Sequence, residues 1–347
     1  MTIRQVLVGA GVVAALVAGS AAPAGAVGAA GAGAAGRRGP AVVVGHGAAA
    51  TPEGATWDAA HHRFLVGSMA HGTVSEVRPD GTLRTLVDDP AHLVSVIGLH
   101  ADPARGRVLV ADGDLGVGDR STPASTAHTA GLGAYDLRTG RRVFHADLAA
   151  AAADGGPHLA NDVAYAPDGT AYVTDTFAPL VYRVTPDGTA EVLVRDPRLA
   201  APAGGIGLNG IVWRDGVLVV GKTDDATLWR IPVDRPAELS RIEVRGADGA
   251  GGAGDRFVGL DGMLGRPDGS VLAVTNHLGD GGRDAELTLR SADGWRSAAL
   301  TADRPLTDTD PTAITAGPGD RVYTLSGRLD LLLAGTPGDG FTLRRVG

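Results

Sequence analysis

Beyond residue 41, hydrophobic residues occur in short runs separated by turns built from Asp-Gly, Pro-Asp-Gly or Arg-Gly. Runs of this length between such turns are typical of β-strands joined as hairpins. A helical period is absent from the sequence, apart from a short alanine-rich stretch over residues 146–153. The pattern predicts an all-β domain over residues 41–347.

The strand and turn pattern repeats along this domain. The repeats are residues 51–87, 94–147, 158–195, 206–245, 257–300 and 311–346. Their spacing fits the period of propeller blades once loop insertions are allowed. A six-bladed β-propeller with a central channel is expected, because radial closure leaves few exposed strand edges. An additional strand over residues 41–45 is expected to complete the last blade and join the two ends of the domain.

One polar residue recurs near the start of several repeats, just before a short apolar strand. The equivalent positions are Glu53, Ile97, Asn161, Asn209, Asp261 and Thr312. Because equivalent positions of a repeat occupy equivalent places around the axis, we expect the two carboxylates and two carboxamides to form a ring. Such a ring offers only oxygen donors, which favour Ca²⁺ over Zn²⁺, with Mg²⁺ and Mn²⁺ as further possibilities. The alternative is that these residues line a water-filled channel.

Loops on one face of the predicted propeller carry the other residues capable of chemistry. Asp261 is the first candidate for a catalytic base, because a carboxylate that holds a metal can also accept a proton. Further candidates are His277 and His158 for catalysis, and Asn161, Phe177, Lys222 and His71 for substrate contact. The insertion over residues 113–131 has no strand pattern and is either a flap over the site or a loose loop.

The composition of the chain excludes several classes of function. The net charge is −8 and Lys222 is the only lysine, so there is no basic stripe for nucleic acid. The absence of cysteine excludes disulfides, thiol chemistry and a lipid-modified cysteine anchor. The expected partner is a small-molecule substrate, and we expect a monomer.

The N-terminus has the pattern of an export signal. Arg4 precedes an apolar run over residues 6–17, and Ala24-Gly25-Ala26 offers a cleavage site. The run is too short to favour a membrane span. We therefore expect a signal peptide over residues 1–26, a disordered Ala/Gly-rich leader over 27–40, and a secreted protein with no membrane attachment after cleavage.

Four motifs carry a resemblance to a known family. In chain order they are Pro52-Glu53-Gly54, Asn161-Asp162-Val163, Leu208-Asn209-Gly210-Ile211 and Leu260-Asp261-Gly262-Met263. Together they resemble the SMP-30/gluconolactonase/luciferin-regenerating-enzyme-like family, relatives of diisopropyl-fluorophosphatase and the paraoxonases, over about residues 50–345. The resemblance implies a six-bladed propeller with a divalent metal, usually calcium or zinc, in its channel.

The resemblance also implies roles for individual residues. Glu53, Asn209 and Asp261 would be metal ligands, and Asn161 a fourth ligand or a substrate contact. The chain departs from the sugar-lactonase members, which commonly have an arginine where Leu159 stands, and from the paraoxonases, which place a histidine near position 97. The expected activity is therefore metal-dependent hydrolysis of a lactone or related ester, with an alkyl or aryl portion favoured over a sugar. The alternatives are a non-catalytic ligand- or protein-binding propeller and a metal-free propeller that resembles strictosidine synthase.

Overall fold

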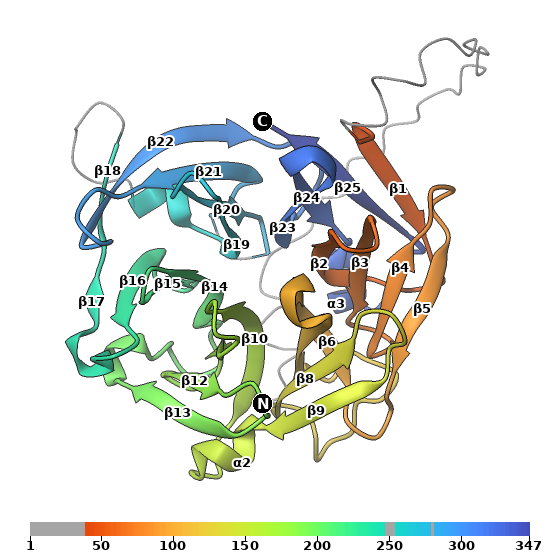
Figure 1. Ribbon diagram of the computed structural model, residues 1–347, viewed down its shortest axis with the longest axis horizontal. Coiled ribbons are helices and arrows are strands. Elements are labelled where there is room, and N and C mark those ends of the chain that lie inside the picture. Colours follow the sequence, from red (N-terminus) through yellow and green to blue (C-terminus); the bar gives the residue numbers. More distant parts are fainter. Residues whose placement is uncertain (1–38, 247–253, 279–280) are drawn as a thin grey trace.

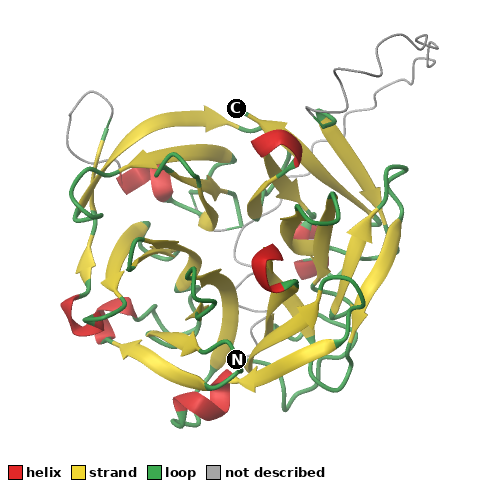
Figure 2. Ribbon diagram, viewed as in Figure 1, coloured by secondary structure: helices red, strands yellow, loops and turns green. Residues whose placement is uncertain are grey.

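The computed structural model describes residues 39–246, 254–278 and 281–347. Its strands surround a central axis (Figure 1), and the described residues contain only two short α-helices, α2 (Leu148–Ala152) and α3 (Leu329–Leu333). Strands dominate the whole ring (Figure 2). The prediction of an all-β propeller is confirmed, and α2 lies within the alanine-rich stretch that was singled out as helical.

Four of the sheets are separate blades of four or five strands. The first contains β2 (Pro52–Asp58), β3 (Arg63–Ser68), β4 (Thr73–Val77) and β5 (Leu83–Asp88). The second contains β14 (Leu208–Arg214), β15 (Val217–Lys222), β16 (Thr227–Pro232) and β17 (Ser240–Arg241). The third contains β19 (Leu260–Gly265), β20 (Val271–Thr275), β21 (Ala285–Arg290) and β22 (Ser297–Pro305), with β18 (Glu243–Arg245) parallel to β22. The fourth contains β23 (Ala313–Ala316), β24 (Val322–Ser326), β25 (Gly340–Val346) and β1 (Val42–His46).

The remaining strands form one eight-stranded sheet, so the structure shows four separate blades and not the six that were expected. One half is β6 (Ser95–Asp102), β7 (Arg107–Gly113), β8 (His128–Asp136) and β9 (Arg142–Asp147). The other half is β10 (His158–Tyr165), β11 (Ala171–Asp175), β12 (Leu180–Val184) and β13 (Ala190–Arg195). The halves are joined because β8 starts beside β10 and pairs with it in parallel at His158↔His128 and Leu159↔Thr129. Hydrophobic periodicity cannot predict a junction made by two residue pairs.

The two ends of the domain meet in one sheet. β1 pairs antiparallel with β25, from Val42↔Arg344 to His46↔Gly340. This pairing confirms that the strand predicted over residues 41–45 completes the last blade. The expected signal peptide, and the leader up to residue 38, lie outside the described residues. No helix in the described ranges has the length and apolar character needed to cross a membrane.

The core lies between neighbouring groups of strands. For example, Val181 of β12, Leu208 and Ile211 of β14 and Trp229 of β16 belong to one buried cluster between β10–β13 and β14–β17. Similar clusters fill the other interfaces and consist mainly of Val, Leu, Ile and Ala. This packing holds the innermost strands at a fixed distance from the axis, where the candidate site lies.

Candidate metal centre and active site

The predicted ring residues lie on the innermost strands, each at a break in the strand pairing. Between β2 and β3 the register shifts from Pro52 to Ala55, and similar shifts occur in β6, β10, β14 and β19. A β-bulge of this kind redirects the side chain at the extra position. Glu53, Asn161, Asn209 and Asp261 line one cavity of about 40 Å³ on the axis, and each is at most 7% exposed. The structure therefore brings the four predicted residues together.

Close backbone packing explains the glycine that follows most ring residues. A Cβ atom on Gly54 would lie 2.3 Å from the carbonyl oxygen of Ile97, and one on Gly210 would lie 2.4 Å from that of Asp261. Only glycine permits this approach without displacing the neighbouring strand. The inner strands can therefore crowd together around the ring, which keeps the cavity small.

Asp162 stands where four of the other five repeats have glycine, and it links two inner strands. Its carboxylate accepts hydrogen bonds from the backbone amides of Val163 at 2.8 Å and Ile211 at 3.3 Å. Burial raises the pKa of Asp162 to about 7. The carboxylate adds negative potential beside the ring and fixes β10 against β14.

Asp261 has one carboxylate oxygen held and one unpaired. The side-chain amide of Asn276 donates to Oδ2 at 2.6 Å and also reaches the carbonyl oxygen of Pro311 at 3.2 Å. Oδ1 is buried and has no hydrogen-bond partner within the described residues. A buried carboxylate oxygen without a partner is costly, and an ion ligated there removes the cost.

The carboxamides of the site are oriented by their neighbours. The Asn161 amide nitrogen donates to Oγ1 of Thr176 at 2.9 Å, and that hydroxyl donates to the carbonyl oxygen of Leu208 at 2.8 Å. With its nitrogen engaged outward, Asn161 keeps its carbonyl oxygen for the cavity. The sequence contains three asparagines, and all of them (Asn161, Asn209 and Asn276) belong to this site. That distribution indicates that the site needs amide groups and that the rest of the fold does not.

The two carboxyl groups of the ring, Glu53 and Asp261, have raised pKa values. Burial raises the pKa of Glu53 well above its usual range, and the negative charges of Asp261 and Asp162 raise it further. Burial also raises the pKa of Asp261 to about 7, although the amides of Asn276 and Asn209 oppose the shift. Carboxylates that repel one another in a buried site are the arrangement that a cation stabilises.

The residues present fit a hard divalent cation. The ring supplies two carboxylates and two amide oxygens, and the described residues that line the cavity include no lysine or arginine to neutralise them. Oxygen donors without thiolate or imidazole suit Ca²⁺ better than Zn²⁺. A volume of about 40 Å³ is a few times what one water requires, which suffices for an ion and a small number of waters.

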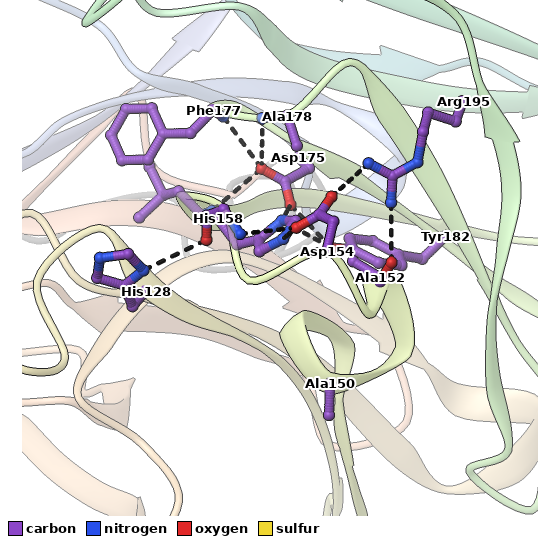
Figure 3. Close-up of polar contacts among 12 residues, drawn as sticks. His128, Ala150, Ala152, Asp154, His158, Asp175, Phe177, Ala178, Tyr182 and Arg195 are labelled. Atoms are coloured by element: carbon purple, nitrogen blue, oxygen red, sulfur yellow. Dashed lines mark hydrogen bonds and ion pairs between the residues drawn. The ribbon is translucent and has the colours of Figure 1, made fainter.

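His158, a predicted catalytic residue, is part of a buried ionic network (Figure 3). Its Nδ1 lies 2.7 Å from Oδ2 of Asp175 and its Nε2 lies 2.8 Å from Oδ1 of Asp154. The hydroxyl of Tyr182 also donates to Asp175, at 2.8 Å, and Arg195 pairs with Asp154. Both ring nitrogens are therefore engaged. This geometry favours a structural role, in which His158 fixes the start of β10 and with it Asn161.

The predicted substrate contacts are also engaged elsewhere. The Lys222 ammonium donates to Asp224 at 2.7 Å and to Asp225 at 2.9 Å, and its side chain is buried. The two nitrogens of His71 contact Asp119 Oδ2 at 2.6 Å and the carbonyl oxygen of Ala48 at 2.7 Å. Neither Lys222 nor His71 lines the ring cavity that the described residues form.

His277 lies next to Asn276 but belongs to a separate cluster. Its Nδ1 is 3.1 Å from Oδ1 of Asp284, and its backbone amide donates to Asp310 at 3.1 Å. The possible ligand atoms of His277, Asp284 and Asp310 lie within 4.8 Å of one another, which makes them a second possible cation position. The His277 side chain is mostly exposed and does not line the ring cavity in the described part of the chain.

An apolar cluster covers the ring on the face of the loops that link second and third strands, which we call the loop face. We call this cluster the cap. Its buried members are Met69, Ala70, Ile97, Leu159, Leu329 and Leu332, and Leu115, Val117, Phe177, Leu278 and Leu333 pack against them. The predicted contact Phe177 is thus part of the cap. The helix α3, which sequence reasoning missed, contributes three of these leucines from an apolar run in a loop.

The insertion over residues 113–131 also contributes to the cap and is not a loose loop. The buried carboxylate of Asp114 accepts hydrogen bonds from Gly116, Ser121 and Ser125, at 2.6 to 2.7 Å. This hub holds Leu115 and Val117 against the cap. The insertion is therefore a fixed cover in the structure.

The ring cavity extends toward the opposite face. It is lined there by Thr56, His100, Leu264 and Thr315, each three residues after a ring position. We call this face, formed by the turns between first and second strands, the turn face. Sequence reasoning did not place His100 in the channel; its offset of three from position 97 was the signal that could have done so.

No protein-family model and no curated protein sequence matches the chain. Three solved structures that match it share its fold at low identity. The allergen Mala s 1 of Malassezia sympodialis has a TM-score of 0.69 at 16% identity, with 89% of this chain and 96% of the allergen covered. A calcium-binding regucalcin from Agrobacterium tumefaciens has a TM-score of 0.56 at 17% identity, with 85% and 90% covered. A gluconolactonase from Xanthomonas campestris has a TM-score of 0.52 at 17% identity, with 91% and 94% covered.

At these identities the likeness establishes the fold alone. The sequence resemblance to the family and the structural matches nevertheless point to the same group of proteins. This chain has the propeller fold of the SMP-30/gluconolactonase-family proteins.

Proposed function

We propose that this protein is a secreted, metal-dependent hydrolase of a lactone or related ester, with Ca²⁺ as the favoured ion. The observation that carries the proposal is the buried, unpaired Oδ1 of Asp261 in a ring of four oxygen-bearing side chains. The lactonase-like fold of the matched structures supports it. Glu53, Asn161, Asn209 and Asp261 would hold the ion, which supplies Lewis-acid polarisation of a substrate oxygen when bound.

The chain's own residues perform the remaining tasks. Asn276 and Thr176 hold Asp261 and Asn161 in fixed orientations through their hydrogen bonds. The Asp261 carboxylate, which the Asn276 amide orients, would accept the proton of the attacking water. The cap places apolar side chains beside the ring on the loop face. Asp261 is accordingly the proton acceptor that we assign, ahead of His277 and His158.

We also propose that the eight-stranded sheet acts as two blades joined at β8 and β10, which would give a six-bladed ring. The antiparallel pairing within β6–β9 and within β10–β13, and the apolar cluster between them, support this reading. The protein would act as a monomer on a small molecule, after export and cleavage of the signal peptide.

The alternative is a propeller that binds a ligand without catalysis. The cap favours it, since packed leucines cover the ring on the face where catalytic loops were expected. Under this alternative the ion would stabilise the fold, and no ester would be turned over.

Substitution of Asp261, the assigned base, distinguishes the hydrolase from the propeller that binds a ligand without catalysis. With a screen of lactones, aryl esters and phosphotriesters, the Ca²⁺-loaded protein should hydrolyse at least one compound. Asp261→Asn should then lower kcat by about 100-fold or more while Ca²⁺ still binds, since an amide ligates but accepts no proton. Asp187→Asn, in an exposed turn, is the matched control and should leave kcat unchanged. Full activity of Asp261→Asn would place the base elsewhere, and no hydrolysis at all would favour the binding protein.

A further inference from the structure

The ring cavity adjoins a larger chamber on the turn face. The two share Thr56, His100, Leu264 and Thr315, so these four residues lie between them, and we call them the connection. The chamber has a volume of about 660 Å³. Its mouth lies among the turn after β2, the 3₁₀ helix η2 (Pro103–Arg105) and the 3₁₀ helix η6 (Pro318–Asp320). The chamber therefore reaches the residues that border the ring cavity, on the face opposite the cap.

The walls of the chamber are largely aromatic and apolar. Trp57 and Tyr165 line it, and the rings of His100 and Tyr165 meet edge to face with centroids 5.0 Å apart. The Tyr165 hydroxyl donates to the carbonyl oxygen of Ala101 at 3.0 Å, which fixes the ring in place. Aromatic walls held rigidly in this way suit a flat apolar group.

The charges along the route disfavour anions. Among the described residues that line the chamber, Asp320 is the only acid and there is no lysine or arginine. Beyond the connection lie Glu53, Asp162 and Asp261. An anionic ligand would meet Asp320 and no lysine or arginine among the described residues of the chamber, whereas a neutral ester would meet no charge that repels it.

The connection itself offers polar groups at the inner end of the chamber. Burial lowers the pKa of His100, so the imidazole is neutral near pH 7, and its Nδ1 lies 3.4 Å from the carbonyl oxygen of Val163. The hydroxyls of Thr56 and Thr315 lie on the same lining. A ligand with one polar end and one apolar end would therefore be oriented with the polar end toward the ring.

We propose that this chamber on the turn face is the substrate-binding site, and that it takes an uncharged lactone or ester with an aryl or alkyl portion. The proposal rests on the proposed hydrolase function for its choice of ligand class. It differs from the expectation that substrate meets the ring from the loop face, where the cap lies.

The absence of cysteine from the sequence allows a direct test by single labelling. Ala316→Cys introduces a thiol at an exposed position in the chamber wall. The matched control is Ala124→Cys, at an exposed position in the insertion on the loop face. Each variant is treated with a bulky maleimide and tested with dihydrocoumarin, a neutral aromatic lactone.

Labelling of Ala316→Cys should lower kcat/KM for dihydrocoumarin at least tenfold, and labelling of Ala124→Cys should leave it within twofold. The reverse pattern would overturn the proposal, because it would place the substrate route on the loop face. Phenylacetate, an anion of similar size, should bind at least tenfold more weakly than dihydrocoumarin when both are measured by saturation-transfer NMR. Equal binding of the two would also contradict the proposal.

The same NMR measurement distinguishes this proposal from the hydrolase proposal. Dihydrocoumarin that binds and is displaced by the label on Ala316→Cys would support the chamber, and the hydrolase would be refuted if neither it nor any other compound of the screen were hydrolysed. Hydrolysis that only the Ala124→Cys label blocks would support the hydrolase and refute the chamber. No binding of dihydrocoumarin to the unlabelled protein would refute the chamber as the site of this ligand class.

Discussion

Asn276 and Asp261 form a pair in which the amide nitrogen donates to Oδ2 at 2.6 Å and leaves Oδ1 buried without a partner. The bond holds the carboxylate, which lines the ring cavity, in one orientation. Partners of this kind orient metal ligands and set their affinity.

Removal of the Asn276 amide should weaken ion binding without removing any ligand. We expect Asn276→Ala to raise the Kd for Ca²⁺ by about 10- to 100-fold, the effect typical of a lost ligand-orienting bond. Calcium titration of chelator-treated protein measures it, with Thr189→Ala in an exposed turn as the control. An unchanged Kd would mean that Asp261 needs no orienting partner.

Chelation should lower the melting temperature. An ion that binds only the folded chain, at 100 times its Kd, adds about 2.7 kcal/mol of stability, which for a domain of this size corresponds to a few degrees. We expect EDTA to lower Tm by about 5 °C and excess Ca²⁺ to restore it, as measured by scanning calorimetry. Asp261→Ala should lose this response and Asp187→Ala should keep it. Identical melting curves with and without EDTA would contradict the binding of an ion to the folded protein.

Ion affinity should fall at acidic pH. The pKa of Asp261 in the ion-free protein is about 7, because burial raises it more than the neighbouring amides lower it. Below that pH the ion must displace a proton, so the apparent Kd should rise by roughly tenfold per pH unit. Above about pH 7 the apparent Kd should depend little on pH. Calcium titrations between pH 5.5 and 8.5 test this, and a Kd that is constant over the range would show that the ring binds no proton.

The network around His158 should also make stability depend on pH. Burial lowers the pKa of His158, but the carboxylates of Asp175 and Asp154 outweigh burial and raise the net value. A raised folded-state pKa contributes stability that is complete below the unfolded value of about 6.5 and is lost as pH rises through the folded value.

We therefore expect His158→Gln to lower Tm most near pH 6 and least near pH 9. Thermal melts across that range measure the difference from the wild type. The exposed His46→Gln is the matched control and should show no such trend. A difference that grew with pH would mean that His158 is neutral in the folded protein.

The repeat made most of this architecture predictable. Glu53, Asn161, Asn209 and Asp261 occupy equivalent places in equivalent strands, so sequence spacing alone put them around one cavity. Asp162, the one residue other than glycine that follows a ring residue, was visible in the sequence, but its bond to Ile211 on the next inner strand was not. Such contacts depend on how neighbouring strands are placed and carry no sequence period.

The side from which the ring is reached could not be predicted. Leu329 and Leu332 read as an ordinary apolar stretch, and only the fold places them over the axis with Phe177. Lys222 and His71 looked available for substrate because their partners, Asp225 and Asp119, gave no signal in the sequence. In each case the prediction failed because the side chain contacts a residue in a loop.

Calcium titration by isothermal calorimetry of the chelator-treated protein tests the central claim, that the ring binds a divalent cation. We predict one site per chain in the wild type, loss of that site in the Glu53→Gln/Asp261→Asn double variant, and retention in Asp284→Asn, which alters the second possible cation position. A site that survives in the double variant and disappears in Asp284→Asn, or no site in the wild type, would contradict it.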